Sequence, residues 1–120
     1  MIIEMLKAKI HRAAVTQTEL HYEGSITIDE ALLEKTGIRV FEKVYIYNID
    51  NGARFETYVI KGRKNAGDIC LNGAAARLAE KGDRIIIAAY CALSEDEAEK
   101  FKPSIIVLDA KNKIKKTGRK

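Results

Sequence analysis

Residues 44–60 read VYIYNIDNGARFETYVI, and this stretch decides the fold class of the chain. Two runs rich in β-branched and aromatic residues, 44–49 and 54–60, flank the tripeptide Asp50-Asn51-Gly52. Asn-Gly between such runs is the strongest short-range signal for a β-hairpin, because both residues tolerate the positive φ that a tight turn requires. The stretch therefore predicts two antiparallel strands joined by a turn.

The segments on either side of the hairpin continue the β pattern in short pieces. Residues 6–11 alternate apolar and polar side chains, as expected of a strand with one face in the core. Short alternating or fully apolar runs predict further strands at 26–28, 69–71, 84–90 and 104–108. The pattern as a whole predicts six or seven strands.

The helices predicted between these strands are short. Asp29 is a suitable N-cap for a helix of about two turns, and Gly37 suits its left-handed C-cap. Residues 74–78 predict roughly one turn, and Ser94 opens a capping-box sequence for another short helix that ends before Pro103. Because none of these helices is long enough for a standard βαβ crossover, the chain is predicted to form a mainly β barrel with a few short helices.

Composition predicts one compact domain over residues 1–110. Of the 120 residues, 47% are hydrophobic and 32% are charged, which is ordinary for a globular protein. The longest apolar run, residues 85–93, is far shorter than the roughly 20 residues of a membrane-spanning helix. We therefore expect no export signal, no membrane partner and a cytoplasmic location. Cys70 and Cys91 are isolated from each other and from the histidines, so neither a metal site nor a disulfide framework is expected.

The net charge of +4 comes from the C-terminal residues. Residues 111–120 contain six Lys or Arg and no acid, whereas the rest of the chain contains 15 basic and 17 acidic residues. Residues 111–120 are therefore predicted to be a basic, disordered tail rather than part of the domain. The slightly acidic domain disfavours a nucleic-acid-binding surface, so no nucleic-acid partner is expected.

The pentapeptide His21-Tyr22-Glu23-Gly24-Ser25 contains the candidate reactive bond. Gly24 leaves the carbonyl between the last two residues unshielded, and Ser25 places a hydroxyl next to it. Gly-Ser pairs are also common in ordinary turns, so this pair alone does not distinguish a reactive bond from a turn. Three further motifs occur with it along the chain: Lys9-x-His11, Asn51-Gly-x-Arg54-Phe-x-Thr57-Tyr58 and Asn72-Gly73-Ala74-Ala75-Ala76.

Together these four motifs resemble the aspartate 1-decarboxylase family, small pyruvoyl-dependent enzymes that make β-alanine for pantothenate and coenzyme A biosynthesis. The resemblance covers about residues 5–103. It implies a double-psi β-barrel, assembled as a homotetramer with active sites between neighbouring subunits. It also implies an inactive precursor that cuts itself between Gly24 and Ser25, giving chains 1–24 and 25–120 and converting Ser25 into the pyruvoyl cofactor. L-Aspartate is the implied substrate, and neither pyridoxal phosphate nor a metal is implied.

The resemblance also assigns roles to single residues. The pyruvoyl group derived from Ser25 would form a Schiff base with the substrate, and Tyr58 would return a proton to the product. Arg54 and Lys9 are the expected anchors for the substrate carboxylates, since a guanidinium fork and a compact ammonium both suit anions. Thr57 is the expected donor to the oxyanion formed during cleavage and also contacts substrate. The other family positions are Gly73, Ala74 and Ala75 in the substrate pocket, with His11, Tyr22, Tyr47 and Asn72 in support.

Two alternatives remain open from the sequence. A pyruvoyl decarboxylase for glutamate would share these motifs, although the extra methylene would displace the distal carboxylate from a fixed Arg54. A non-catalytic small β module that binds nucleic acid would account for the pI of about 9.1, but it requires basic residues within the fold. Tyr47 stands where well-known members of the family have tryptophan, which exchanges one large aromatic for another in the pocket wall.

Overall fold

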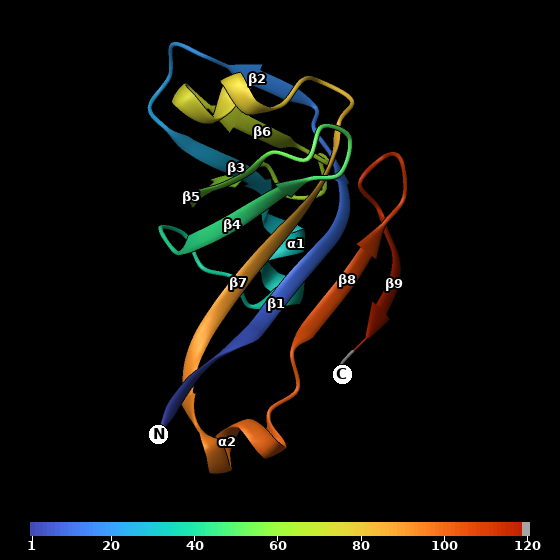
Figure 1. Cartoon of the computed structure of the whole chain (residues 1–120). Helices are drawn as coiled ribbons and strands as arrows, with labels where there is room; N and C mark the ends of the chain where they lie inside the picture. Colours follow the sequence, from blue (N-terminus) through green and yellow to red (C-terminus); the bar gives the residue numbers. More distant parts are fainter. Residues whose placement is uncertain (119–120) are drawn as a thin grey trace.

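The computed structural model describes residues 1–118 and consists mainly of β-strands (Figure 1). The strands are β1 (Ile2–Ala14), β2 (Gln17–Glu19), β3 (Ser25–Asp29), β4 (Lys43–Asn48), β5 (Arg54–Gly62), β6 (Ile69–Asn72), β7 (Arg84–Ser94), β8 (Ser104–Leu108) and β9 (Ile114–Gly118). The helices are α1 (Glu30–Thr36), α2 (Glu95–Lys100) and the 3-10 helix η1 (Gly73–Leu78). The mainly β class with a few short helices is therefore confirmed, while the double-psi closure of the barrel stays a prediction.

The strands form one mixed sheet in the order β2-β6-β3-β5-β4-β7-β1-β8-β9. β1 and β7 pair antiparallel from Ile2↔Ser94 to Ala14↔Arg84. In Figure 1 they run side by side through the molecule, with α2 beyond one end and β2, β6 and η1 near the other. Three pairs are parallel, β1 with β8, β2 with β6 and β3 with β5. Strands that are distant in the sequence are thereby brought together.

Alternation along the strands separates the core from an outward polar face. In β4, Val44 and Ile46 are fully buried, whereas Tyr45 and Tyr47 are only partly covered. This is the period of two expected of a strand with one face in the core. The outward face of the β4–β5 hairpin therefore carries aromatic and charged side chains, and several predicted site residues lie there.

The hairpin between β4 and β5 forms as predicted, with Tyr47 paired to Arg54 beside the turn. Its loop is more open than a turn with two positive φ angles, because Gly52 has φ of 78° and is the one loop residue in that region. The side chain of Asn48 supports the loop instead. Its Oδ1 accepts from the backbone N–H of Asp50 at 2.9 Å and its Nδ2 donates to Asp83 Oδ2 at 2.9 Å.

The helix ends follow the predicted capping residues. Asp29 Oδ1 accepts from the Ala31 N–H at 2.8 Å, and Gly37 closes α1 with φ of 77°. Ser94 and Glu97 form both hydrogen bonds of a capping box at the start of α2. The hydrogen bond from the Ser94 backbone N–H to the Glu97 carboxyl, with a smaller contribution from the Ser94 side chain, holds the pKa of that carboxyl below its usual range. Within the described part of the chain, no helix is long and apolar enough to cross a membrane.

The C-terminal segment differs from the predicted disordered tail. Residues 114–118 form β9, which pairs antiparallel with β8, and Arg119 and Lys120 lie outside the described residues. Asn112 explains the order, because it is buried and bridges two other segments. Its Oδ1 accepts from the Ala14 N–H at 2.7 Å, and its Nδ2 donates to the carbonyls of Ala14 at 2.9 Å and Gly67 at 2.8 Å. Asn112 lies among basic residues in the sequence, so its burial could not be predicted from the charge pattern.

We expect Asn112→Ala to lower the free energy of unfolding by about 2 kcal/mol, because it leaves the buried carbonyl of Gly67 and the partly buried backbone groups of Ala14 without their partner. Thermal and denaturant unfolding of the purified protein would measure the change. Lys116→Ala, a substitution at an exposed position of β9, is the matched control and should change stability by less than about 0.5 kcal/mol. Equal stability of the two variants would contradict the role given to Asn112.

Candidate active site

Ser25 is the first residue of β3 and is almost fully buried, with 1% of its surface exposed. Its hydroxyl donates to the Glu23 carbonyl at 3.2 Å and accepts from Asn72 Nδ2 at 2.9 Å. The pairing of β3 with β6 places Ser25 directly opposite Asn72. The hydroxyl of Ser25, in the candidate cleavage bond, therefore both donates and accepts a hydrogen bond.

Asn72 is a buried side chain whose orientation is fixed by several partners. Besides Ser25, its Nδ2 donates to Thr27 Oγ1 at 3.1 Å, and its Oδ1 accepts from the Cys70 thiol at 3.1 Å. Burial raises the pKa of the Cys70 thiol, and Glu19 and Asp68 raise it further, so the thiol keeps the proton that it donates. Because Cys70 occupies the oxygen of the amide, the NH₂ group of Asn72 faces Ser25.

Gly73 allows the cleavage segment, residues 22–24 before the candidate bond, to pass close to the backbone of η1. Gly73 has φ of 67°, and a Cβ added to it would lie 2.7 Å from both the N and Cα atoms of Gly24 and 2.8 Å from the Tyr22 carbonyl oxygen. A Cβ added to Gly24 itself would meet nothing within 4 Å. Close packing at the candidate bond therefore requires glycine at position 73, which is distant in the sequence, rather than at position 24. Ala75 beside it is buried and Ala74 is exposed.

A second group of predicted site residues lies on the outward face of the sheet. Arg54 and Tyr58 are both exposed on β5, as the alternation predicted. The Arg54 guanidinium carbon is 3.9 Å from the centroid of the Tyr47 ring. Lys9 on β1 pairs with Ala88 on β7, which pairs in turn with Tyr45 on β4. The three side chains predicted to bind and protonate substrate therefore belong to one face, but they are spread across it.

The strand β5 connects the two groups. It pairs with β3 in parallel, with Ile26 opposite Val59, so Ser25 lies level with Tyr58. Arg54 is four residues before Tyr58, which corresponds to roughly 13 Å along a strand. The chain thus brings Ser25, Asn72 and Gly73 into one cluster and Arg54 with Tyr47 into another.

The remaining predicted residues are placed as follows. Thr57 is half-buried on β5 opposite Val44, and Tyr22 is 59% exposed. His11 has a buried Nδ1 that makes no hydrogen bond to the described residues. Burial lowers the pKa of His11, with contributions from Lys9 and Arg12, so its ring is neutral at pH 7. Among residues 1–118 there is no group of three or more His, Cys, Asp or Glu side chains that could hold a metal ion.

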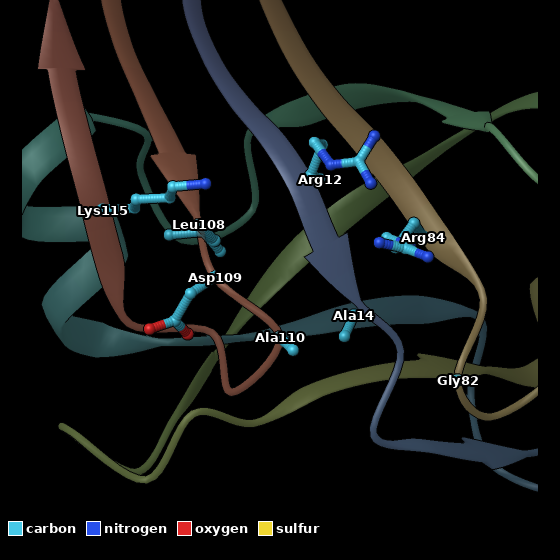
Figure 2. Close-up of a pocket in the computed structure, with 8 residues that line it drawn as sticks. All are labelled: Arg12, Ala14, Gly82, Arg84, Leu108, Asp109, Ala110 and Lys115. Carbon is cyan, nitrogen blue, oxygen red and sulfur yellow. The ribbon is translucent and has the colours of Figure 1, made fainter.

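One surface cavity lies beside Arg54 and Tyr47, and another lies away from both clusters. A groove of about 640 Å³ on the β4–β5 face is lined by Tyr45, Tyr47, Arg54, Phe55 and Glu56. Another cavity, of about 460 Å³, lies beside β1, β7 and β8 and is shown in Figure 2. Its charged side chains are Arg12, Arg84, Asp109 and Lys115, and it contains none of the residues predicted for catalysis. The chemistry predicted for Ser25 therefore belongs to the β3–β6 region rather than to this cavity.

The chain belongs to the aspartate decarboxylase family, since the model of that family, described as "Aspartate decarboxylase", matches residues 1–115. An aspartate 1-decarboxylase of Clostridium botulinum (strain Loch Maree / Type A3) is 61% identical over 116 residues, which cover 97% of this chain and 91% of the relative. The aspartate 1-decarboxylase of Clostridium beijerinckii is 60% identical over 115 residues, covering 96% and 93%. That of Caldicellulosiruptor saccharolyticus is 58% identical over 120 residues, covering 100% and 94%. The family resemblance drawn from four motifs is therefore confirmed over nearly the whole chain.

We expect Gly73→Ala to slow the predicted cleavage at Gly24–Ser25 at least tenfold, because the added methyl group would push the backbone of residues 22–24 away from its position. The fraction of cut chain, followed by intact-mass spectrometry during warm incubation, measures the rate.

The matched control for this substitution is Gly52→Ala. Gly52 has a similar φ of 78°, but its surroundings are open within 4 Å. This control introduces the backbone strain without the clash, so it should cleave at the rate of the unchanged chain. Equal slowing in both variants would assign the effect to strain or misfolding instead of to contact with the cleavage segment.

Proposed function

We propose that this protein decarboxylates L-aspartate to β-alanine and CO₂ and so supplies β-alanine for pantothenate biosynthesis. The observation that carries the proposal is family membership over residues 1–115 together with a buried Ser25 whose hydroxyl is held by Asn72. The relatives named above are aspartate 1-decarboxylases at about 60% identity. A cytoplasmic location is part of the proposal.

Maturation of the precursor is the first step that we assign to this site. Attack of the Ser25 hydroxyl on the Gly24 carbonyl breaks the amide and forms an ester, with the hydroxyl proton passing to the freed amine. Elimination then removes the Cα proton of residue 25 and breaks its Cβ–O bond, which releases Gly24 as a carboxylate and that proton. It leaves an unsaturated residue 25, whose hydrolysis releases ammonia and gives a pyruvoyl group. Thr57 is proposed to donate to the oxyanion, and loss of one such donor raises a barrier by about 3–4 kcal/mol.

The surroundings of Ser25 fit a small pyruvoyl group at that position. Gly73 adds no side chain, Ala75 adds a methyl group, and Asn72 offers a hydrogen-bond donor at position 25. When formed, the group supplies a reactive carbonyl that can take up the substrate amine and accept the electrons left by departing CO₂. The cofactor is thus proposed to come from the chain itself, without pyridoxal phosphate or a metal.

Arg54 and Lys9 are proposed to hold the two carboxylates of aspartate. Among residues 1–118, neither side chain forms an ion pair within 4.0 Å, so both charges are available to an anion. Arg54 also lines the groove on the β4–β5 face. Tyr58 lies level with Ser25 on the paired strand, which supports Tyr58 as the group that returns a proton to the carbon from which CO₂ has left.

The separation of the two clusters supports a homotetramer with active sites between subunits. In one chain Arg54 lies roughly 13 Å along β5 from the position level with Ser25, which is farther than aspartate can bridge. A neighbouring copy could bring its own outward face to Ser25. Exposed aromatic side chains at Tyr22 (59%) and Phe41 (75%) are suitable for such a contact.

We expect Ser25→Ala to abolish both chain cleavage and CO₂ release from L-aspartate, because the nucleophile and the source of the cofactor are the same hydroxyl. Intact-mass spectrometry should show fragments 1–24 and 25–120 for the unchanged protein and a single chain for the variant. A protein that stays whole after prolonged warm incubation and releases no CO₂ from aspartate would refute the proposal. Faster release from glutamate than from aspartate would instead support the glutamate alternative.

Tyr58→Phe should cleave at the normal rate but decarboxylate at least a hundredfold more slowly, since it removes one positioned proton donor. Comparing the extent of cleavage by mass spectrometry with kcat for CO₂ release separates the two effects. Unchanged kcat in fully cleaved Tyr58→Phe would remove the proton-donor role.

A further inference from the structure

Tyr90 is a partly buried residue of β7 to which the sequence motifs assign no role. Its hydroxyl lies 2.8 Å from the hydroxyl of Tyr47 on β4. Tyr47 is in turn the residue whose ring stacks on the Arg54 guanidinium. Three side chains from three neighbouring strands thus form one continuous series of contacts that ends at the proposed carboxylate anchor.

The contact between the two tyrosines is not a consequence of strand register alone. Tyr47 pairs with Ile86, and Tyr45 pairs with Ala88, so Tyr90 is displaced along β7 by four residues from the partner of Tyr47. Four residues correspond to roughly 13 Å along a strand, and both side chains must lean toward each other to meet. The small side chain of Ala88 lies between them in the register and leaves room for this approach.

The Tyr90 ring has its own support on the outward face. It packs edge-on against the ring of Tyr45, with centroids 5.3 Å apart and planes at 80°. This is a favourable geometry for two aromatic rings. Tyr90 therefore presents its hydroxyl to Tyr47 from a fixed position, and the hydrogen bond restricts rotation of the Tyr47 ring.

Arg54 depends on that ring for its orientation. The guanidinium carbon lies 3.9 Å from the centroid of the Tyr47 ring. At this distance the flat face of a guanidinium can stack on the ring, which leaves its N–H donors free for a carboxylate that accepts two of them. No ion pair within 4.0 Å fixes the exposed Arg54 side chain among residues 1–118. A freely rotating Tyr47 ring would leave the guanidinium without a defined position.

We propose that Tyr90 is a positioning residue for substrate binding, whose hydroxyl holds the Tyr47 ring so that Arg54 presents its guanidinium to a carboxylate of the substrate. The inference rests on the proposed role of Arg54 in aspartate decarboxylation. It extends that role to a residue of β7 that would not itself touch the substrate.

The protonation of Tyr90 supports a neutral hydrogen bond rather than a charged one. Burial raises the pKa of Tyr90 to about 12, and the hydrogen bond to Tyr47 adds to the rise, while Arg54 acts in the opposite direction. The hydroxyl therefore keeps its proton throughout the neutral range. A loss caused by removing this hydroxyl should be the same at pH 6.5 and pH 8.5.

The test is Tyr90→Phe in the fully cleaved enzyme, assayed by CO₂ release over a range of L-aspartate concentrations. KM should rise about threefold to tenfold at both pH values, the effect of one lost hydrogen bond, while kcat changes less than twofold. Tyr47→Phe should give the same rise. The double variant should be no worse than either single variant, because both substitutions remove the same contact.

Two further variants separate positioning from general packing. Cys91→Ala alters packing next to Tyr90 on β7 while keeping both tyrosine hydroxyls, so its KM should stay within 1.5-fold, an estimate of roughly a quarter of a kcal/mol. In an Arg54→Lys background, which keeps the charge but loses the flat stacking surface, adding Tyr90→Phe should change KM less than about twofold. Extent of cleavage and melting temperature are recorded for every variant.

An unchanged KM in Tyr90→Phe, with a wild-type enzyme active on aspartate, would overturn this inference and leave the proposed function intact. So would additive effects of the two tyrosine substitutions, or an equal rise in Cys91→Ala. A wild-type protein that releases no CO₂ from aspartate would overturn the proposed function, and this inference with it.

Discussion

The double pairing of β5 is the constraint on which the candidate site depends. β5 pairs antiparallel with β4, with Thr57 opposite Val44, and in parallel with β3, with Val59 opposite Ile26. The first pairing directs Arg54 and Tyr58 outward, and the second places Ser25 level with Tyr58. Because side chains alternate between faces with a period of two, a slip of one residue in either pairing would send these groups to opposite sides of the sheet. Burial of Val44, Ile46 and Val59 on the inner face prevents that slip.

A second constraint acts on the immediate surroundings of Ser25. A buried amide left without partners costs about 1–3 kcal/mol, so Asn72 is held firmly by the groups that surround it. Its contacts with Cys70, Thr27 and Ser25 join β3 and β6 through side chains as well as through the backbone. Cys70 could be recognised from the sequence only as a packed thiol, because a thiol that orients an amide leaves no spacing signal of its own.

The sequence predicted those features that depend on local pattern. The hairpin, the caps of α1 and α2 and the outward alternation of Arg54 and Tyr58 each follow from neighbouring residues, and each is confirmed. Features that depend on contacts between distant segments were not predicted. Asn112 orders a segment that was predicted from its charge to be a disordered tail. Tyr90 contacts Tyr47 although the two residues are not paired in the sheet. The family resemblance proposed the site residues in advance, but their grouping into two clusters follows from β5 and could not be inferred from spacing.

The position of β1 in the sheet has a consequence for the proposed cut. Residues 1–24 include all of β1 and β2, and β1 lies between β7 and β8 rather than at an edge. Once the bond at Gly24 opens, a strand from the middle of the sheet belongs to a separate polypeptide. Recovery of the cut protein from denaturant is then a bimolecular association whose rate depends on concentration, whereas the uncut chain refolds in a unimolecular reaction. Cleavage would therefore slow refolding of the denatured protein at low concentration, whereas the uncut chain would refold at a rate that does not depend on concentration.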